Sequence, residues 1–71
     1  MAKQISIDTD HRKGQLFKVT ETGGRYHTYE TDVGFFTSHK KIGEAGSLQD
    51  ALEIIKAQVK GTVREVRIKD L

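Results

Sequence analysis

One segment of this 71-residue chain, residues 47–61, constrains the fold more than any other, because it alone has the pattern of a helix with marked ends. Ser47 followed by Asp50 is typical of a helix start: the hydroxyl accepts a hydrogen bond from a first-turn amide, and the acid lies near the positive end of the helix dipole. Gly61 is typical of the residue just past a helix. The apolar residues recur at helical spacing and form one stripe, which consists of Leu48, Ala51, Leu52, Ile55 and Val59. The segment therefore predicts one amphipathic helix packed on another element.

The remainder of the chain has the character of a sheet. Four segments have the alternation or the composition of strands: residues 3–8, 15–21, 25–31 and 62–69. Residues 32–37 can continue the sheet after a bend at Gly34, and the polar residues 38–46 predict a connection into the helix. We therefore expect one α+β domain over residues 1–71. It should contain an antiparallel sheet of about four strands, in the order β-β-β-α-β, with the helix packed on one face.

The hairpin between the second and third strands has two possible registers. A two-residue loop at Gly23-Gly24 places Tyr26 on the same face as Phe17. A three-residue loop would place His27 and Tyr29 there instead, because a one-residue slip reverses the faces of a strand. The two-residue loop is favoured, since Gly-Gly suits a tight hairpin turn.

Several apolar residues have ambiguous positions. Phe35 and Phe36 are adjacent, so in an extended chain they point to opposite faces; one should reach the core and the other needs cover or a partner. Ile54 lies off the helical stripe, and a contact with the sheet is favoured over an exposed position used by a partner. Val66 and Ile68 should face inward from the last strand. A chain this small has a marginal core, and without cysteine it has no disulfide to add stability, so oligomerisation is expected.

Composition excludes several classes of function. The net charge is +2, from 12 basic and 10 acidic residues, which by itself does not argue for nucleic acid. No apolar run is long enough to cross a membrane, and the N-terminal residues do not form a signal peptide, so a cytoplasmic location is expected. The three histidines lie on separate segments without metal-ligand spacing, and no serine has a recognisable catalytic partner. We expect no cofactor, no metal and no catalytic residue, and hence a protein that is not an enzyme.

The most suggestive polar cluster is the run of aromatic and basic residues at 35–41, since such residues beside a sheet can stack bases and contact phosphates. The candidate binding surface consists of Arg12, Arg25, Tyr29, Phe36, His39, Lys40, Lys41 and Ile54. The first expectation is a non-enzymatic binding module that contacts a protein partner as a homodimer. The alternative is a nucleic-acid-binding module that uses the sheet aromatics and the Lys40-Lys41 loop.

Three segments, residues 17–19, 23–29 and 47–55, resemble the N-terminal domains of HicB-type antitoxins and their stand-alone relatives. That family has a hairpin whose second strand begins with a Gly-aromatic step, then a further strand, then a helix opened by a Ser/Thr-x-x-acid-Ala signature. This chain differs in its longer stretch over residues 35–46, and it ends without a DNA-binding extension. The resemblance implies a dimeric protein-binding scaffold rather than a repressor.

Overall fold

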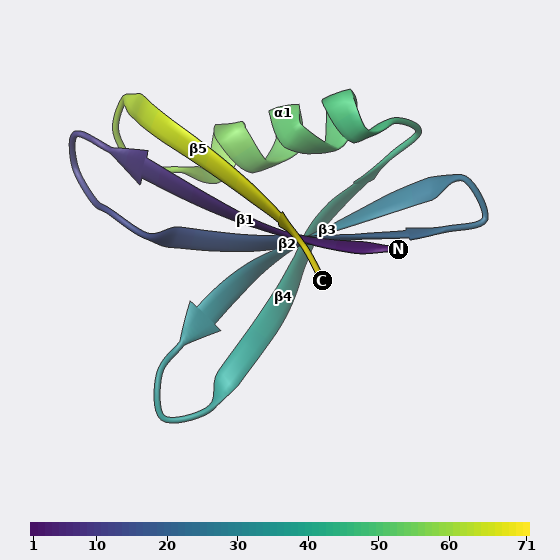
Figure 1. Cartoon of the computed structure of the whole chain (residues 1–71), viewed down its shortest axis with the longest axis horizontal. Coiled ribbons are helices and arrows are strands. Elements are labelled where there is room, and N and C mark those ends of the chain that lie inside the picture. The colour runs from purple at the N-terminus through teal and green to yellow at the C-terminus, as the bar shows by residue number, and fades with distance from the viewer.

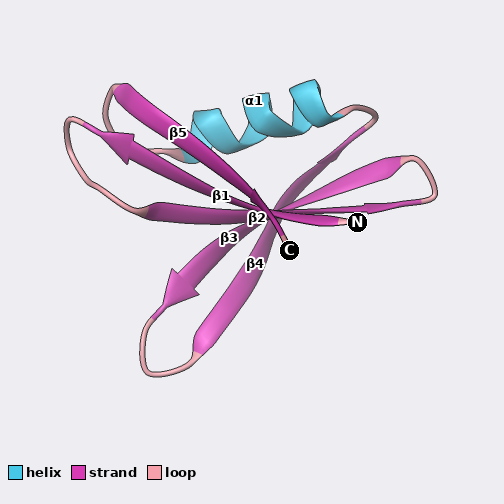
Figure 2. Cartoon of the chain, in the orientation of Figure 1, coloured by secondary structure: helices cyan, strands magenta, loops and turns pink.

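Five strands form one antiparallel sheet in the computed structural model, which describes the whole chain, residues 1–71. The elements in chain order are β1 (Ala2–Thr9), β2 (Gln15–Thr22), β3 (Arg25–Val33), β4 (Thr37–Ala45), α1 (Leu48–Gln58) and β5 (Val63–Asp70). The strand order in the sheet is β4-β3-β2-β1-β5, so β1 to β4 form a meander and β5 returns to pair with β1 at the far edge (Figure 1). Figure 2 shows the single helix, which connects the two edge strands and lies on one side of the sheet.

The helix begins as predicted and ends slightly earlier. The Ser47 hydroxyl accepts a hydrogen bond from the Asp50 amide at 3.2 Å, which is the expected N-cap. The last helical residue is Gln58, and Val59 is already extended. Gly61 has a φ of +94°, so its left-handed conformation shapes the loop into β5 rather than the helix end itself.

The two-residue hairpin register is confirmed. Thr22 pairs with Arg25 across Gly23 and Gly24, whose φ angles of +59° and +78° suit a tight turn between twisted strands. Tyr26 consequently packs against the hydrophobic core from the helix-bearing face.

The predicted antiparallel sheet with one helix is confirmed, but it has one strand more than the roughly four expected, because the expected polar connection over residues 38–46 forms most of β4. Residues 37–41 are exposed on an edge strand, so no face of it needed apolar side chains and the alternation that marks a strand is absent. Residues 34–36 form the turn between β3 and β4. The prediction that Phe35 or Phe36 reaches the core was wrong, because both lie at this turn and are 95% and 81% exposed. Their two rings contact each other edge to face, with the ring centroids 5.1 Å apart.

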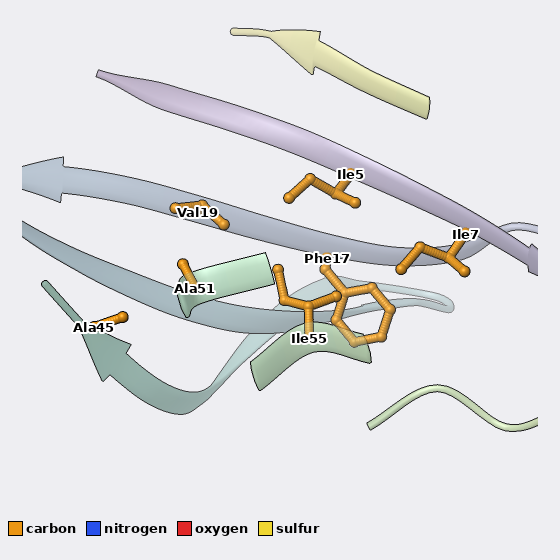
Figure 3. Close-up of a cluster of buried hydrophobic side chains, with 7 residues drawn as sticks. All are labelled: Ile5, Ile7, Phe17, Val19, Ala45, Ala51 and Ile55. Carbon is orange, nitrogen blue, oxygen red and sulfur yellow. The ribbon is translucent and has the colours of Figure 1, made fainter. Parts of the chain in front are cut away.

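The core lies between α1 and the middle of the sheet (Figure 3). It consists of the side chains of Ile5, Ile7, Phe17, Val19, Ala45, Ala51 and Ile55. The helix backbone lies nearest β3 and β4, the core beneath it includes side chains of β1 and β2, and no residue of β5 belongs to this core. Val66 and Ile68 therefore face the predicted side of the sheet but remain 37% and 47% exposed.

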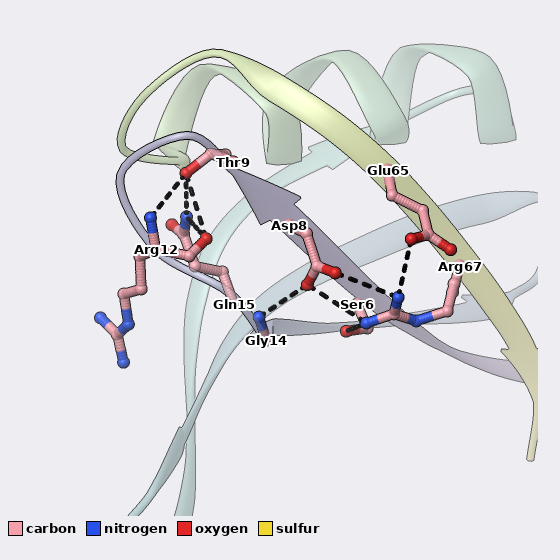
Figure 4. A network of polar contacts seen from close by, with 8 residues as sticks. All are labelled: Ser6, Asp8, Thr9, Arg12, Gly14, Gln15, Glu65 and Arg67. Atoms are coloured by element: carbon pink, nitrogen blue, oxygen red, sulfur yellow. Dashed lines mark hydrogen bonds and ion pairs between the residues drawn. The ribbon is translucent and has the colours of Figure 1, made fainter.

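A polar network closes the end of the core between the β1–β2 loop and the α1–β5 loop (Figure 4). The buried side-chain amide of Gln15 accepts a hydrogen bond from the Lys60 amide at 3.1 Å and donates to the Lys60 carbonyl at 3.2 Å. The buried Thr9 hydroxyl accepts a hydrogen bond from the Arg12 amide at 3.0 Å. Because these buried groups find partners within the network, they are best read as structural.

Candidate functional site: the uncovered sheet face

The sheet face opposite α1 is covered by no element of the chain (Figure 1). Side chains alternate between the two faces of a strand. Phe17 and Val19 of β2 point into the core under the helix, so Leu16 and Lys18 point to the opposite face. We call this second face the uncovered face.

The register of the strands lines up one row of side chains across the uncovered face. Residues directly opposite each other on neighbouring antiparallel strands project to the same side. The row, from β4 to β5, consists of Lys41, Tyr29, Lys18, Gln4 and Lys69. We call it the central row. Its one aromatic ring, that of Tyr29, is flanked on both sides by lysines.

A second row runs beside the central row and consists of His39, Thr31, Leu16, Ser6 and Arg67. His39 Nδ1 lies 3.0 Å from the Thr31 hydroxyl. A hollow of about 220 Å³ is lined by Lys18, Tyr29 and His39 together with Thr20. An adjoining hollow of about 310 Å³ shares Lys18 and His39. The two hollows therefore adjoin along the two rows, with Lys18 and His39 lining both.

One carboxylate offsets part of the positive charge of the uncovered face at its β3–β4 side. The Glu44 carboxylate forms ion pairs with the ammonium of Lys41 and, at 3.3 Å, with the guanidinium of Arg25, and it lies 3.2 Å from His27 Nδ1. The hydrogen bond from Lys41, followed by that from Arg25, lowers the pKa of Glu44 to about 2. Arg25 and Lys41 are thus held in place by one carboxylate.

The lowered pKa of Glu44 predicts a loss of stability in acid. Its pKa is about 2 in the folded state against 4.5 ordinarily, so the unfolded chain binds the proton more tightly. The stabilisation should be complete above about pH 4.5 and should disappear as the pH falls towards 2. The free energy of unfolding in urea, measured between pH 5 and 2, should fall with decreasing pH in the unaltered protein. In Glu44→Gln the slope of this free energy against pH should be smaller, by the equivalent of up to about one bound proton. Equal slopes in the two proteins would contradict this assignment.

The β1–β5 side of the face is also neutralised, by two carboxylates around one arginine. The Arg67 guanidinium donates to both Asp8 oxygens at 3.1 and 3.2 Å and lies 3.2 Å from Glu65 (Figure 4). Asp8 also accepts a hydrogen bond from the Gly14 amide at 2.8 Å, and this bond and Arg67 lower the pKa of Asp8. Lys18, on β2 between these two groups, and Lys69, on the edge strand β5, have no acidic side chain within ion-pair distance. The centre of the face therefore carries uncompensated positive charge.

The structure gathers half of the residues predicted for a binding surface. Arg25, Tyr29, His39 and Lys41 all lie on the uncovered face. Lys40 lies in β4 rather than in a loop, and it pairs with Glu30 on the opposite face, so the two neighbouring lysines do not act together.

The other predicted residues lie elsewhere. Phe36 is at the tip of the β3–β4 hairpin, beyond the sheet face. Arg12 is in the β1–β2 loop and lines a separate hollow near Gln58. Ile54 is half-buried against the core, where it lies over Gly43, so the favoured interpretation of a sheet contact is confirmed and the interpretation as an exposed partner residue was wrong.

Sequence reasoning missed Lys18 and Lys69, the two cations of the uncovered face without acidic partners. Lys18 lies between Phe17 and Val19, so the alternation of β2 already placed it away from the core. What joined it to Tyr29 and Lys69 was the order of the strands, in which β3, β2, β1 and β5 lie side by side.

The structure shows no group of three histidine, cysteine, aspartate or glutamate side chains that is placed to hold a metal ion. None of its helices has the length and apolarity needed to cross a membrane. No family model, curated protein or solved structure matches the chain. The resemblance to HicB-type N-terminal domains stays a prediction.

Proposed function

We propose that this chain is a non-enzymatic binding module whose uncovered sheet face binds single-stranded nucleic acid. The observation that carries the proposal is the central row, in which Tyr29 is flanked by Lys18 on β2 and by Lys41 on β4. An aromatic ring on an open sheet face offers a stacking platform for an unpaired base, and cations beside it attract phosphates.

The spacing within the row suits this role. Neighbouring strands lie about 4.8 Å apart, so each lysine stands one strand away from the ring on either side. Lys18 has no acidic partner and is available to a phosphate, whereas Lys41 is already bound to Glu44. The His39 ring lines the same hollow as Tyr29 and adds a second planar group. Recognition would depend on stacking and charge, with little discrimination between sequences.

Fluorescence anisotropy with a labelled single-stranded oligonucleotide at low salt tests the proposal. Tyr29→Ala should weaken binding by about 5- to 160-fold, the effect of losing one stacked base, whereas Tyr29→Phe should retain most of the affinity. Lys18→Ala should weaken binding and make the salt dependence shallower. The slope of log affinity against log salt concentration should fall in magnitude by about one, the contribution of one phosphate contact. A duplex should compete poorly because its bases are already paired.

Lys40→Ala is the matched control, since Lys40 neighbours Lys41 in the chain but pairs with Glu30 on the opposite face. It should bind like the unaltered protein. The proposal fails if the unaltered protein shows no anisotropy change at low salt with protein in excess. It fails equally if Lys40→Ala weakens binding as much as Lys18→Ala does.

A protein partner, bound by the chain as a homodimer, is the second candidate, and exposed apolar side chains support it. Phe35 and Phe36 project from the β3–β4 hairpin, and Val66 and Ile68 are half-exposed on β5. Exposed apolar groups gathered at two places are typical of protein contact sites. This candidate requires the chain to associate with itself in solution.

A further inference from the structure

β5 ends the sheet with its outer backbone groups unpaired and with apolar side chains on the helix-bearing face. Val66 and Ile68 are the exposed apolar residues in the part of the strand that pairs regularly with β1. Such an edge is a template for another strand unless charge, a bulge or a covering element blocks it. We propose that a second copy of this chain pairs its β5 antiparallel with this β5, about a two-fold axis at Arg67.

The direction of the backbone groups defines which residues can pair. The Leu71 amide donates to the Ala2 carbonyl at 3.0 Å, so it points towards β1. Because successive residues of a strand alternate in direction, the backbone groups of Lys69 and Arg67 also point towards β1. Those of Val66 and Ile68 therefore point to the free edge.

An axis at Arg67 uses these free groups. It places Val66 opposite Ile68 of the second copy, and each such pair exchanges both backbone hydrogen bonds. The apolar side chains of the pair then meet on the helix-bearing face. The two-fold axis generates the same pair a second time.

The same axis matches the charges along the strand. It places Glu65 opposite Lys69 of the second copy on the uncovered face, and Arg64 opposite Asp70 by register, with each pair occurring twice. Arg67 meets its own copy at the axis, but each guanidinium is already neutralised by Asp8 and Glu65.

Two-fold axes at the neighbouring positions Val66 and Ile68 would also keep the two helix-bearing faces on the same side, but they match the side chains of the two β5 strands less well. An axis at Val66 would place Ile68 opposite Arg64 of the second copy. An axis at Ile68 would place Arg67 opposite Lys69 of the second copy. Opposed like charges, or an apolar side chain opposed to a charged one, lose the cross-strand attraction that stabilises a pair.

The other edge of the sheet is protected. β4 carries Lys40 and Lys41 at its exposed end and has an irregularity in its pairing with β3 between Thr28 and Tyr29. Like charges and bulges keep an edge strand from pairing; β5 also carries charged side chains, but these are of both signs and can match one another across an axis. β5 is paired regularly with β1 from Glu65 to Asp70, its irregularity lying beyond this stretch, opposite Asp8 and Thr9.

This inference concerns β5, whereas the nucleic-acid proposal is tested at Lys18 and Tyr29 on the two strands beyond β1. Either can therefore fail without the other. Pairing would join two sheets of five strands edge to edge, with both uncovered faces on the same side. Lys69 would then be matched with Glu65 of the second copy, which leaves Lys18 as the free cation of the central row.

Sedimentation equilibrium on two charge reversals tests both the dimer and its register. Glu65→Lys alone and Lys69→Glu alone each oppose like charges at two places across the axis, so each should weaken self-association by about tenfold or more. A mixture of the two variants restores opposite charges at both places. The mixture should therefore form a heterodimer about as readily as the unaltered protein forms its homodimer.

Of the two charge-reversal variants, Lys69→Glu breaks no ion pair of the monomer, because Lys69 has no ion-pair partner within its own chain. It is also specific for the register, since an axis at Val66 would leave position 69 opposite the uncharged Val63. The proposal is overturned if the unaltered protein stays monomeric up to about millimolar concentration, the affinity of the weakest contacts. It is overturned equally if Lys69→Glu leaves the dimer intact, if the mixture fails to associate, or if a Phe35→Ser/Phe36→Ser variant disperses the dimer instead.

Discussion

Gly61→Ala is expected to destabilise the protein by about 3 kcal/mol or more. The φ of Gly61 is +94°, a conformation that a residue with a Cβ adopts only under strain. A Cβ there would also collide with Asp10 Oδ1 and would lie 2.7 Å from the His11 Cβ and 2.9 Å from the Thr9 hydroxyl. Because Thr9 belongs to the buried network with Gln15, the α1–β5 loop has little freedom to move away.

Urea unfolding of Gly61→Ala measures this effect, with Gly14→Ala as the matched control. Gly14 has a similar positive φ of +69°, but a Cβ there would meet nothing within 4 Å. In Gly14→Ala the free energy of unfolding should fall only by the cost of holding an alanine in the left-handed conformation, about 1–2 kcal/mol. A chain of this size has about 4–10 kcal/mol of stability in all, so Gly61→Ala should leave a detectable unfolded fraction. Equal losses in the two variants would show that the close contacts around Gly61 are relieved without cost.

Ile5→Ala is expected to cost about 2–5 kcal/mol, whereas Ile68→Ala should cost less than about 1 kcal/mol in dilute protein. The two isoleucines are directly paired across β1 and β5 and face the same side of the sheet. Ile5 is fully buried, but Ile68 is 47% exposed because the core beneath the helix extends to β1 and includes no residue of β5. The pair therefore measures the contribution of the helix cover with residue type and face held constant.

The measurement is the free energy of unfolding in urea, taken at a protein concentration where the unaltered chain is monomeric. A loss in Ile68→Ala as large as that in Ile5→Ala would mean that β5 is covered within the single chain. A cost of Ile68→Ala that grows with protein concentration is what the proposed β5 pairing predicts, since the side chain is then covered by the second copy.

Elements with local signals were predictable. The start of α1 follows from the Ser47 hydroxyl and the Asp50 amide, which lie three residues apart in the chain. The hairpin register follows from Gly23-Gly24, because two adjacent residues with positive φ select one turn. In both cases the deciding interaction joins residues only a few positions apart, so a short sequence pattern is enough to predict it.

β4 and the hairpin tip were not predictable in the same way. A strand is recognised by the alternation that a buried face imposes, and residues 37–41 have both faces exposed. Adjacent Phe35 and Phe36 suggested that one of them is buried, but the chain turns there before either can reach the core. Hydrophobic pattern reports where a side chain could be buried and does not report where the helix happens to lie.

The candidate site shows the same division. Tyr29, His39 and Lys41 were recognisable as residue types suited to binding, whereas Lys18 gained that role from the residues opposite it. A central row that draws one side chain from each of five strands is a product of strand order and register. Neither is written in any short segment of the chain.

By itself the sequence determined a capped amphipathic helix, a tight hairpin and a sheet with one apolar face, since these depend on interactions between near neighbours. Only the tertiary structure decided that the helix covers the sheet as far as β1 and leaves β5 bare. That choice depends on which strands lie beside each other, through contacts between residues far apart in the chain. It creates both surfaces on which the proposals depend, the basic uncovered face and the unpaired edge of β5.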